Sequence, residues 1–541
     1  MRENLVESLF EGRVPYEIYH PFPELVEPSA GQLRGLRENL LQAENPISGV
    51  ELLKRWEILS RGEYWGAPLR TRLCALLGEC NPSAALSAAV HFALGRDLVE
   101  NFGTKAQKQN VGGKNPPVFS FALTESSPGS DVSQIQTLAR QEGDDFVLSG
   151  QKDWVTNGLY AGFFIIVART QPMRAGTKPG LTTFLVERQP GMRIEKLDTA
   201  ALSHAGVAKV SFDDLRIPRS AILGDLGKGM RVIRAGLAGA RLLVSAAAAG
   251  ACRRVYNDTI SFLEERRAFG RPLANFPSVR AEIAKVLSDV LAVETLVLAA
   301  AGDPLTRRES FLERGVVRLF VADAAERVFH GARELYGARA FTTQEGGKQP
   351  RVSWADARAL TLLDGSDFAL QSAVVLEGTE PFRRKIASLS STSEQLDHLD
   401  LLGAQTLERM RGKLRRALSP HIPKMRMDEL ESFTTALGEL VRDKLKKHRD
   451  YFVEMHNLHR RILCITTELA GWLALASRVR TEAEKHGEVG ARRMREVAEV
   501  WVTGAVLRIR SSMEALDENQ DPTLDRIAVR AMGDRSYPFE G

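Results

Sequence analysis

A strand-rich block set between long helical stretches is the feature that most restricts how this chain can fold. From residue 30 to about residue 110, and again from Gly229 onward, apolar residues recur every three or four positions, as in amphipathic helices. Between these stretches, Val118–Pro218 carries short β-type runs separated by turn-forming segments such as Glu142-Gly143-Asp144-Asp145. This order predicts a mainly α fold with a central antiparallel β-domain.

The length of 541 residues predicts several domains rather than one core. The changes of periodicity place an N-terminal helical domain at 1–115, a middle β-domain at 116–226 and a C-terminal helical domain at 227–388. A short polar linker after residue 388 then leads into an additional helical domain at 395–541, whose tail, 517–541, is polar and is expected to be turn-rich.

Composition excludes several classes of protein. Hydrophobic residues make up 44% and charged residues 26%, which is typical of a globular protein and not of a disordered or collagen-like chain. The four cysteines have no metal-ligand spacing, so we expect no structural metal. No apolar run reaches the roughly 20 residues of a bilayer span, and the N-terminus lacks the pattern of a signal peptide. We therefore expect a cytoplasmic protein.

The net charge of +5 is unevenly placed, because twelve Lys/Arg and only five acids lie between Arg409 and Arg449. Such a stretch could contact an anionic membrane surface, a phosphate-bearing ligand or an acidic protein. A solvated helix face is the alternative. We expect no nucleic-acid partner.

Two polar motifs stand at predicted strand ends. Thr124–Asp131 (Thr-Glu-Ser-Ser-Pro-Gly-Ser-Asp) combines a hydroxyl with small residues whose backbone N–H groups suit a phosphate, although such a segment is often only a turn. In Trp154–Gly158 (Trp-Val-Thr-Asn-Gly), the two-residue spacing predicts that Trp154 and Thr156 share one face of a strand. A planar ring could stack on the indole there; a core Trp is the alternative.

The two motifs together resemble the acyl-CoA dehydrogenase flavoproteins, whose middle domain carries Thr-Glu-x-x-x-Gly-Ser-Asp followed by Trp-Ile/Val-Thr-Asn-Gly. Phe212–Pro218, Leu223–Gly229 and Glu265–Leu273 continue the resemblance in the family's order. The resemblance implies the family's fold, which is a helical domain, a β-barrel and a four-helix bundle. Residues 395–541 resemble the helical extension of the very-long-chain branch, which implies a homodimer.

The resemblance also implies FAD as cofactor and gives roles to matched positions. Thr124 and Thr156 are expected to contact the isoalloxazine, with Trp154 beside its ring. Ser130 is expected at the FAD phosphates or at the thioester arm of the substrate. Arg266 and Phe269 resemble the pair that reaches the FAD of the neighbouring subunit. Gly337 and Ser366 are also expected at the cofactor, and Gly365 is expected at the substrate.

Asp364 stands where the resemblance places the family's catalytic glutamate, eight residues after Asp356. It is expected to remove the α-proton of an acyl thioester while hydride leaves the β-carbon for flavin N5. A helix N-cap at Asp364 or Ser366 is the alternative. Arg241 matches a family arginine near the base and would keep Asp364 ionised, unless it is a helix-surface residue.

The chain also departs from the family pattern, because the Gln-x-x-Gly-Gly-x-Gly element reads Glu334–Ala340 and keeps only Gly337. The predicted function is FAD-dependent α,β-dehydrogenation of an acyl-CoA or acyl-carrier-protein thioester, with an electron-transfer flavoprotein as acceptor. The alternatives are an O2-using flavin oxidase or monooxygenase on the same fold, and an assembly or binding protein that has lost the cofactor.

Overall fold

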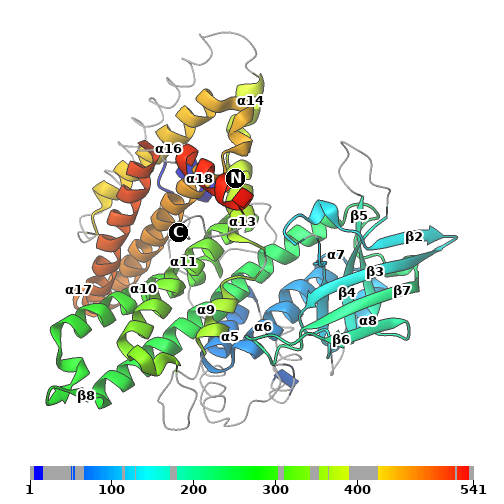
Figure 1. Ribbon diagram of the computed structural model, residues 1–541, viewed down its shortest axis with the longest axis horizontal. Coiled ribbons are helices and arrows are strands. Elements are labelled where there is room, and N and C mark those ends of the chain that lie inside the picture. The colour runs from blue at the N-terminus through cyan, green and yellow to red at the C-terminus, as the bar shows by residue number, and fades with distance from the viewer. Residues whose placement is uncertain are drawn as a thin grey trace. The chain divides into compact units, whose positions relative to one another are not determined.

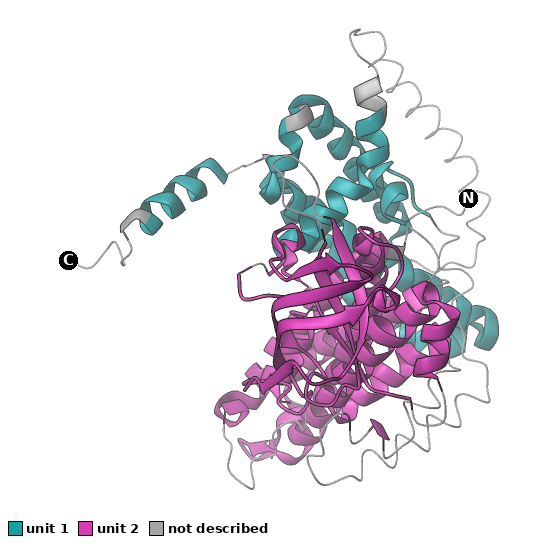
Figure 2. Ribbon diagram, turned by 90° about the vertical axis from the view of Figure 1, so that its right-hand side faces the viewer, with its two compact units in different colours: residues 1–20, 368–541 teal, residues 21–367 magenta. Residues whose placement is uncertain are grey.

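The computed structural model describes residues 5–15, 50, 53–54, 66–112, 116–127, 129–170, 180–301, 310–341, 353–363, 365–388, 425–517 and 521–534. The chain divides into two compact units, one of residues 21–367 and one of residues 1–20 with 368–541 (Figure 2). The four predicted domain boundaries stay a prediction, because units defined by contacts need not coincide with domains.

In the described part of the larger unit, five short helices precede the sheet and follow one another with few residues between them. Asn81 separates the first two, and its side chain accepts a hydrogen bond of 2.9 Å from the backbone N–H of Ala84. A π-helical turn follows the second helix directly. The elements are α5 (Ala67–Cys80), α6 (Pro82–His91), η2 (Phe92–Arg96), α7 (Asp97–Phe102) and α8 (Lys105–Val111).

Seven strands then form one sheet, in the order β1-β4-β2-β3-β7-β6, with β5 on β4 (Figure 1). The predicted sheet was antiparallel, whereas the observed sheet is mixed, because β1 and β2 both pair with β4 in parallel. β1 can do so because β2 and β3 intervene in the chain, which supplies the long connection that parallel neighbours need. The strands are β1 (Phe119–Ala122), β2 (Leu138–Glu142), β3 (Asp145–Val155), β4 (Phe163–Arg169), β5 (Leu181–Glu187), β6 (Met192–Lys196) and β7 (Ala208–Pro218).

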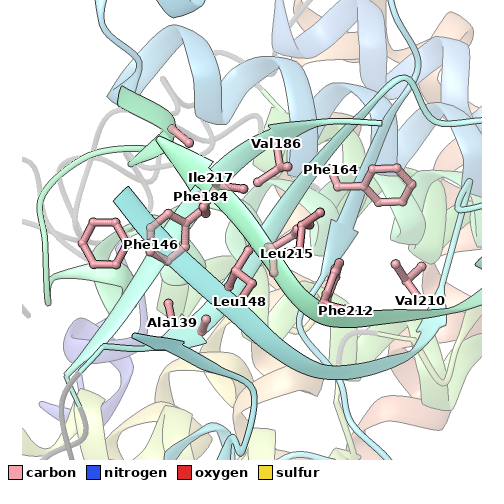
Figure 3. Close-up of a cluster of buried hydrophobic side chains, with 14 of the residues drawn as sticks. Ala139, Phe146, Leu148, Phe164, Phe184, Val186, Val210, Phe212, Leu215 and Ile217 are labelled. Carbon is pink, nitrogen blue, oxygen red and sulfur yellow. The ribbon is translucent and has the colours of Figure 1, made fainter. Parts of the chain in front are cut away.

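The sheet curls around a cluster of buried apolar side chains (Figure 3). In β7 every second residue is buried at Ala208, Val210 and Phe212, as the period of a strand with one core face requires. The rings of Phe146 on β3 and Phe184 on β5 lie 5.4 Å apart between centroids. This core holds the strand ends that carry the two polar motifs.

Long helices complete the larger unit. The Ala-rich helix α9 packs backbone to backbone on α5, because a Cβ added at Gly78 would overlap the carbonyl of Ala247, and one added at Gly250 would overlap that of Ala75. The elements are α9 (Gly229–Glu265), β8 (Arg267–Ala268), β9 (Arg271–Pro272), α10 (Pro277–Ala301), α11 (Ser310–Tyr336), η6 (Gly337–Phe341) and α12 (Trp354–Leu360).

Helices are the only regular secondary structure among the described residues of the smaller unit. Its elements are α1 (Leu5–Phe10), α13 (Asp367–Gly378), α14 (Glu380–Ser388), α16 (Met427–His448), η7 (Arg449–Glu454), α17 (His456–Asp517) and α18 (Asp521–Asp534). Gly487 interrupts α17 with a φ of 70°. The basic stretch lies partly on α16, while residues 409–424 fall outside the described part of the chain.

The expectation of a turn-rich tail is wrong for residues 521–534, which form α18. The helix begins with Asp521 and Pro522, which suit a first turn, and Leu524, Ile527 and Ala528 follow at helical spacing. Arg461 ties the start of α18 to α17 through two hydrogen bonds to Asp521 of 2.6 and 2.8 Å.

Two helices, α9 and α17, are long and apolar enough to cross a membrane by length and composition alone. However, the apolar windows of the two helices are 83% and 89% buried inside the protein. Such burial is the environment of a core helix and gives only weak support to a membrane span.

Candidate active site

The two polar motifs lie against each other, as expected for parts of one site. The backbone N–H of Asp153 donates to the carbonyl of Thr124 at 2.9 Å, and the Ser126 hydroxyl donates to the Asp153 carboxylate. Thr124 is the second residue after β1, and Asp153 lies near the end of β3. The strand ends therefore bring Thr124–Asp131 and Trp154–Gly158 together.

A buried ion pair beneath these motifs was not predicted. Lys152 Nζ lies 2.7 Å from Glu125 Oε1 and donates a hydrogen bond of 3.0 Å to the carbonyl of Leu123. The Thr137 hydroxyl at 2.6 Å and the Gln136 N–H at 2.8 Å also donate to the Glu125 carboxylate. The contacts join β3 to the residues just before β2 and just after β1. The available signal was the alternation of β3, which turns Lys152 toward its buried face.

The pair is charged in a nearly dry environment. Burial lowers the pKa of Lys152 to about 8, against the opposing effect of Glu125. Burial alone would raise the pKa of the Glu125 carboxyl. The hydrogen bond and charge of Lys152 and the bonds from Thr137 and Gln136 outweigh it, so the pKa of Glu125 is lowered overall.

Trp154 lies on the surface of the sheet and not in its core. Its side chain is 61% exposed and its φ is +57°, which is unusual for an aromatic residue. The pairing of β3 with β7 shifts register between Lys152 and Val155, and β3 ends at Val155, so Thr156 lies in the following turn. The core-Trp alternative is therefore wrong. The strand argument for a shared face of Trp154 and Thr156 is wrong as well, because the regular alternation ends before Thr156.

These groups fit an aromatic cofactor with a polar edge. The indole of Trp154 offers a flat exposed surface. Thr156, two residues further along the chain, and Thr124, whose carbonyl accepts from the N–H of Asp153, are half-buried and carry hydroxyls. Gly129 and Ser130, on the neighbouring segment, are both exposed and could meet phosphate oxygens. The isoalloxazine and diphosphate of FAD have this combination of surfaces.

The segment expected to carry catalysis meets the same loop. The N–H of Ser366 donates to Ser130 Oγ at 3.1 Å, and the two hydroxyl oxygens lie 3.3 Å apart. Gly365 has a φ of +104°, which favours glycine at this position. Asp364 itself lies outside the described residues, so its orientation stays untested. Ser366 directly precedes the first residue of α13, which keeps the N-cap alternative for Ser366 open.

Arg241 is buried, so the surface-residue alternative is wrong. Its guanidinium lies 4.5 Å from the ring centroid of Phe311 on α11, and Arg234 contacts the same ring at 4.2 Å. The Ala-rich surface of α9 thus presents Arg241 to α11, the helix that also contacts the segment preceding Asp364.

Arg266 and Phe269 lie at the far end of α9, on the small β8–β9 hairpin. Phe269 and Gly270 form its tip with φ values of +49° and +79°, and the Phe269 ring is 95% exposed. Positive φ at both central residues is the geometry of a tight hairpin turn. Exposed Arg266 and an exposed aromatic ring are available for contact outside this chain.

Gly337 ends α11 with a φ of +58°, so it also serves as a helix terminator. It lies near the hairpin, because the ring of the preceding Tyr336 stacks on Phe262 with 4.3 Å between centroids. The structure thus groups Arg266, Phe269 and Gly337 at one end of the bundle. Thr124, Ser130, Trp154, Thr156, Gly365 and Ser366 form a second group at the sheet.

Asp356 is a further residue whose role was not predicted. Its carboxylate accepts a hydrogen bond of 2.5 Å from the N–H of Leu202, a residue held at a φ of +52° in the loop between β6 and β7. The contact joins α12 to the β-domain. The Asp-Ala-Arg motif at Asp356–Arg358 could have pointed to it, but only the fold shows the partner.

Comparison with known proteins agrees with this architecture. Residues 120–215 match the family model "Acyl-CoA dehydrogenase, middle domain", and residues 227–375 match "Acyl-CoA dehydrogenase, C-terminal domain". The very long-chain specific acyl-CoA dehydrogenase, mitochondrial, of Homo sapiens is 25% identical over 95% of this chain and 84% of its own length. That coverage includes the C-terminal helical extension.

Solved structures share the fold. An acyl-CoA dehydrogenase complexed with FAD from Bacillus anthracis covers 98% of this chain and 95% of its own, with a TM-score of 0.75 and 16% identity. The prolyl acyl carrier protein oxidase AnaB covers 65% of this chain and 98% of its own, with a TM-score of 0.59 and 20% identity. The predicted fold class and the extra helical region are confirmed. The chain belongs to the acyl-CoA dehydrogenase family of FAD-dependent oxidoreductases, which act on CH–CH bonds.

Proposed function

We propose that this protein introduces an α,β double bond into an acyl thioester, with Asp364 as the base. The observation that carries the proposal is the contact between Ser130 and Ser366. Because Ser366 is two residues from Asp364, this contact supports a position of the base near the loop of the flavin motif.

The thioester carrier is CoA or an acyl carrier protein. The human relative is named for very-long-chain acyl-CoA, and AnaB is named for a prolyl group on an acyl carrier protein. Both carriers present the same chemistry, since a thioester carbonyl acidifies its α-hydrogens. We propose an electron-transfer flavoprotein as the acceptor of the electrons.

In this proposal the Asp364 carboxylate takes the α-proton, while bound FAD supplies the acceptor for the β-hydride. The buried cation of Arg241 favours the ionised form of a nearby carboxylate. Trp154 and Thr124 bind and orient the ring system at the sheet surface. Arg266 and Phe269 extend to the FAD of a second copy in a homodimer, which would give the exposed hairpin its partner.

Anaerobic stopped-flow spectroscopy of the FAD-loaded protein tests the proposal with saturated acyl-CoA and acyl-carrier-protein thioesters. We expect wild-type flavin to be bleached, and Asp364→Asn to stay yellow and reduce about 100- to 10,000-fold more slowly, the usual contribution of a general base. Asp198→Asn, on the exposed surface, is the matched control and should reduce at the wild-type rate.

Failure of every thioester to reduce wild-type FAD would refute the proposal. Reduction of Asp364→Asn at the wild-type rate would assign the base elsewhere. Reduced flavin that reoxidises rapidly in air with release of peroxide would instead support the oxidase alternative.

A further inference from the structure

Arg318 is a buried cation in the middle of an apolar segment of α11. It stands in Val316-Val317-Arg318-Leu319-Phe320, and its side chain is only 1% exposed. Keeping a guanidinium in such an environment costs free energy unless other groups compensate its charge and its N–H groups. The groups that Arg318 contacts therefore indicate the role of this buried cation.

Two of those contacts bracket the Asp364 position. Arg318 Nε donates to the carbonyl of Leu363 at 3.1 Å, and Arg318 Nη2 lies 3.3 Å from Asp367 Oδ1. One guanidinium thus holds the residue before Asp364 and the third residue after it. The Ser366–Ser130 hydrogen bond holds the same segment from the side of the β-domain.

We propose that Arg318 is a positioning residue, which fixes residues 363–367 so that the base at 364 meets the α-carbon of the substrate. The inference rests on the proposed function. Position is critical here because Asp has one methylene less than the family's glutamate. A displacement of about 1 Å can lower a rate about 100-fold.

The planar guanidinium suits this task better than an ammonium group would. Its N–H donors point in fixed directions, so one side chain can contact the Leu363 carbonyl and the Asp367 carboxylate together. A lysine at 318 would keep the charge but would present it as a point on a flexible stem. Arg318→Lys therefore separates positioning from simple charge.

Arg327→Lys is the matched control for this substitution. Arg327 lies on the same helix, nine residues further or roughly 14 Å along its axis. Its Nη2 contacts Asp289 at 2.7 Å and its Nε contacts the same carboxylate at 3.1 Å. The control variant therefore also loses a contact of two guanidinium nitrogens with a carboxylate, but away from residues 363–367.

Two measurements on the FAD-loaded full chain test the inference. In stopped-flow reduction by the best acyl thioester, Arg318→Lys should lower the limiting rate about 100-fold and change the apparent Kd by less than threefold. In hydrogen–deuterium exchange, peptides covering residues 360–368 should exchange at least tenfold faster than in wild type. Arg327→Lys should change neither quantity.

An unchanged limiting rate together with unchanged exchange in Arg318→Lys would overturn the inference. If no thioester reduces wild-type flavin, the proposed function fails, and the exchange measurement alone then decides on Arg318. If Arg318→Lys does not fold, Asp367→Asn replaces it, because this variant keeps the Leu363 hydrogen bond and removes only the ion pair. It should show a loss in rate of about tenfold, and wild-type behaviour in both measurements would overturn the inference.

Discussion

Removing the positive member of the buried Lys152–Glu125 pair should destabilise the protein strongly. Lys152→Met keeps an unbranched side chain of similar length but leaves the Glu125 carboxylate buried without its cation. The loss of one partner from a buried pair costs about 3–5 kcal/mol, because the remaining charge is no longer compensated. Thr137 and Gln136 still donate hydrogen bonds to Glu125, so we expect the lower end of this range.

The destabilisation should depend on pH in a definite direction. In wild type the pKa of Glu125 lies below its ordinary value, so its stabilising contribution is present above pH 4.5 and is lost as the pH falls through the lowered pKa. In Lys152→Met, burial would raise the pKa of Glu125 instead. The variant then loses stability as the pH rises, so its deficit relative to wild type is largest near pH 7 and shrinks toward pH 4.

Urea unfolding at a fixed FAD concentration, repeated between pH 4 and pH 7, measures this deficit. Lys196→Met is the matched control, because the Lys196–Asp198 pair on β6 of the same sheet has a contact of 2.6 Å but is exposed. It should unfold almost as wild type does. Combining Lys152→Met with Glu125→Gln should recover part of the stability, because the amide is neutral and its oxygen can still accept the hydrogen bonds of Thr137 and Gln136. Equal midpoints for the two lysine variants, or a deficit that does not change with pH, would refute the reasoning.

Two further predictions concern His91 and Trp154. Burial, with Arg70 and Arg96 nearby, lowers the pKa of His91 to about 3, so only the unfolded chain takes up a proton as the pH falls below 6.5. Between pH 7 and pH 4.5, the free energy of unfolding should therefore fall by about 2.5 kcal/mol less in His91→Gln than in wild type. An equal fall for the two proteins in urea titrations would contradict this. Trp154→Ala should weaken FAD binding roughly 2- to 13-fold, the equivalent of about 0.5–1.5 kcal/mol for aromatic stacking, without lowering the urea midpoint of the FAD-free protein. Unaltered affinity in a fluorescence titration would show that the indole does not meet the ring.

The sequence was sufficient to place Thr124 after one strand and Trp154 near the end of another, because strand ends are marked by a change in residue type. That the two motifs belong to one site followed from the family resemblance. The sequence was also sufficient to place α9, whose apolar periodicity is long and unbroken. Side-chain placement near Trp154 could not be predicted in the same way. The register shift that ends the regular alternation depends on the pairing of β3 with β7, which are far apart in the chain.

The partners of the buried charged side chains could not be predicted from the sequence either. Arg318 stands among apolar residues, and the alternation of β3 turns Lys152 toward the buried face, but the sequence does not say which oxygen each one reaches. Their partners Glu125 and Leu363 are 27 and 45 residues away. The helix α18 was missed for a different reason, because its few apolar residues are diluted by charges and look like a polar tail.

The backbone contact between α5 and α9 limits how this enzyme can diversify. Where two main chains touch at Gly78 and Gly250, no larger residue can be accepted unless one helix slides away from the other. Arg241 lies on the same helix as Gly250, so a shift of α9 would move its guanidinium away from the Phe311 ring. We therefore expect differences in substrate range to arise from elements outside the α5–α9 contact. The alanines and glycines within this contact should tolerate few substitutions.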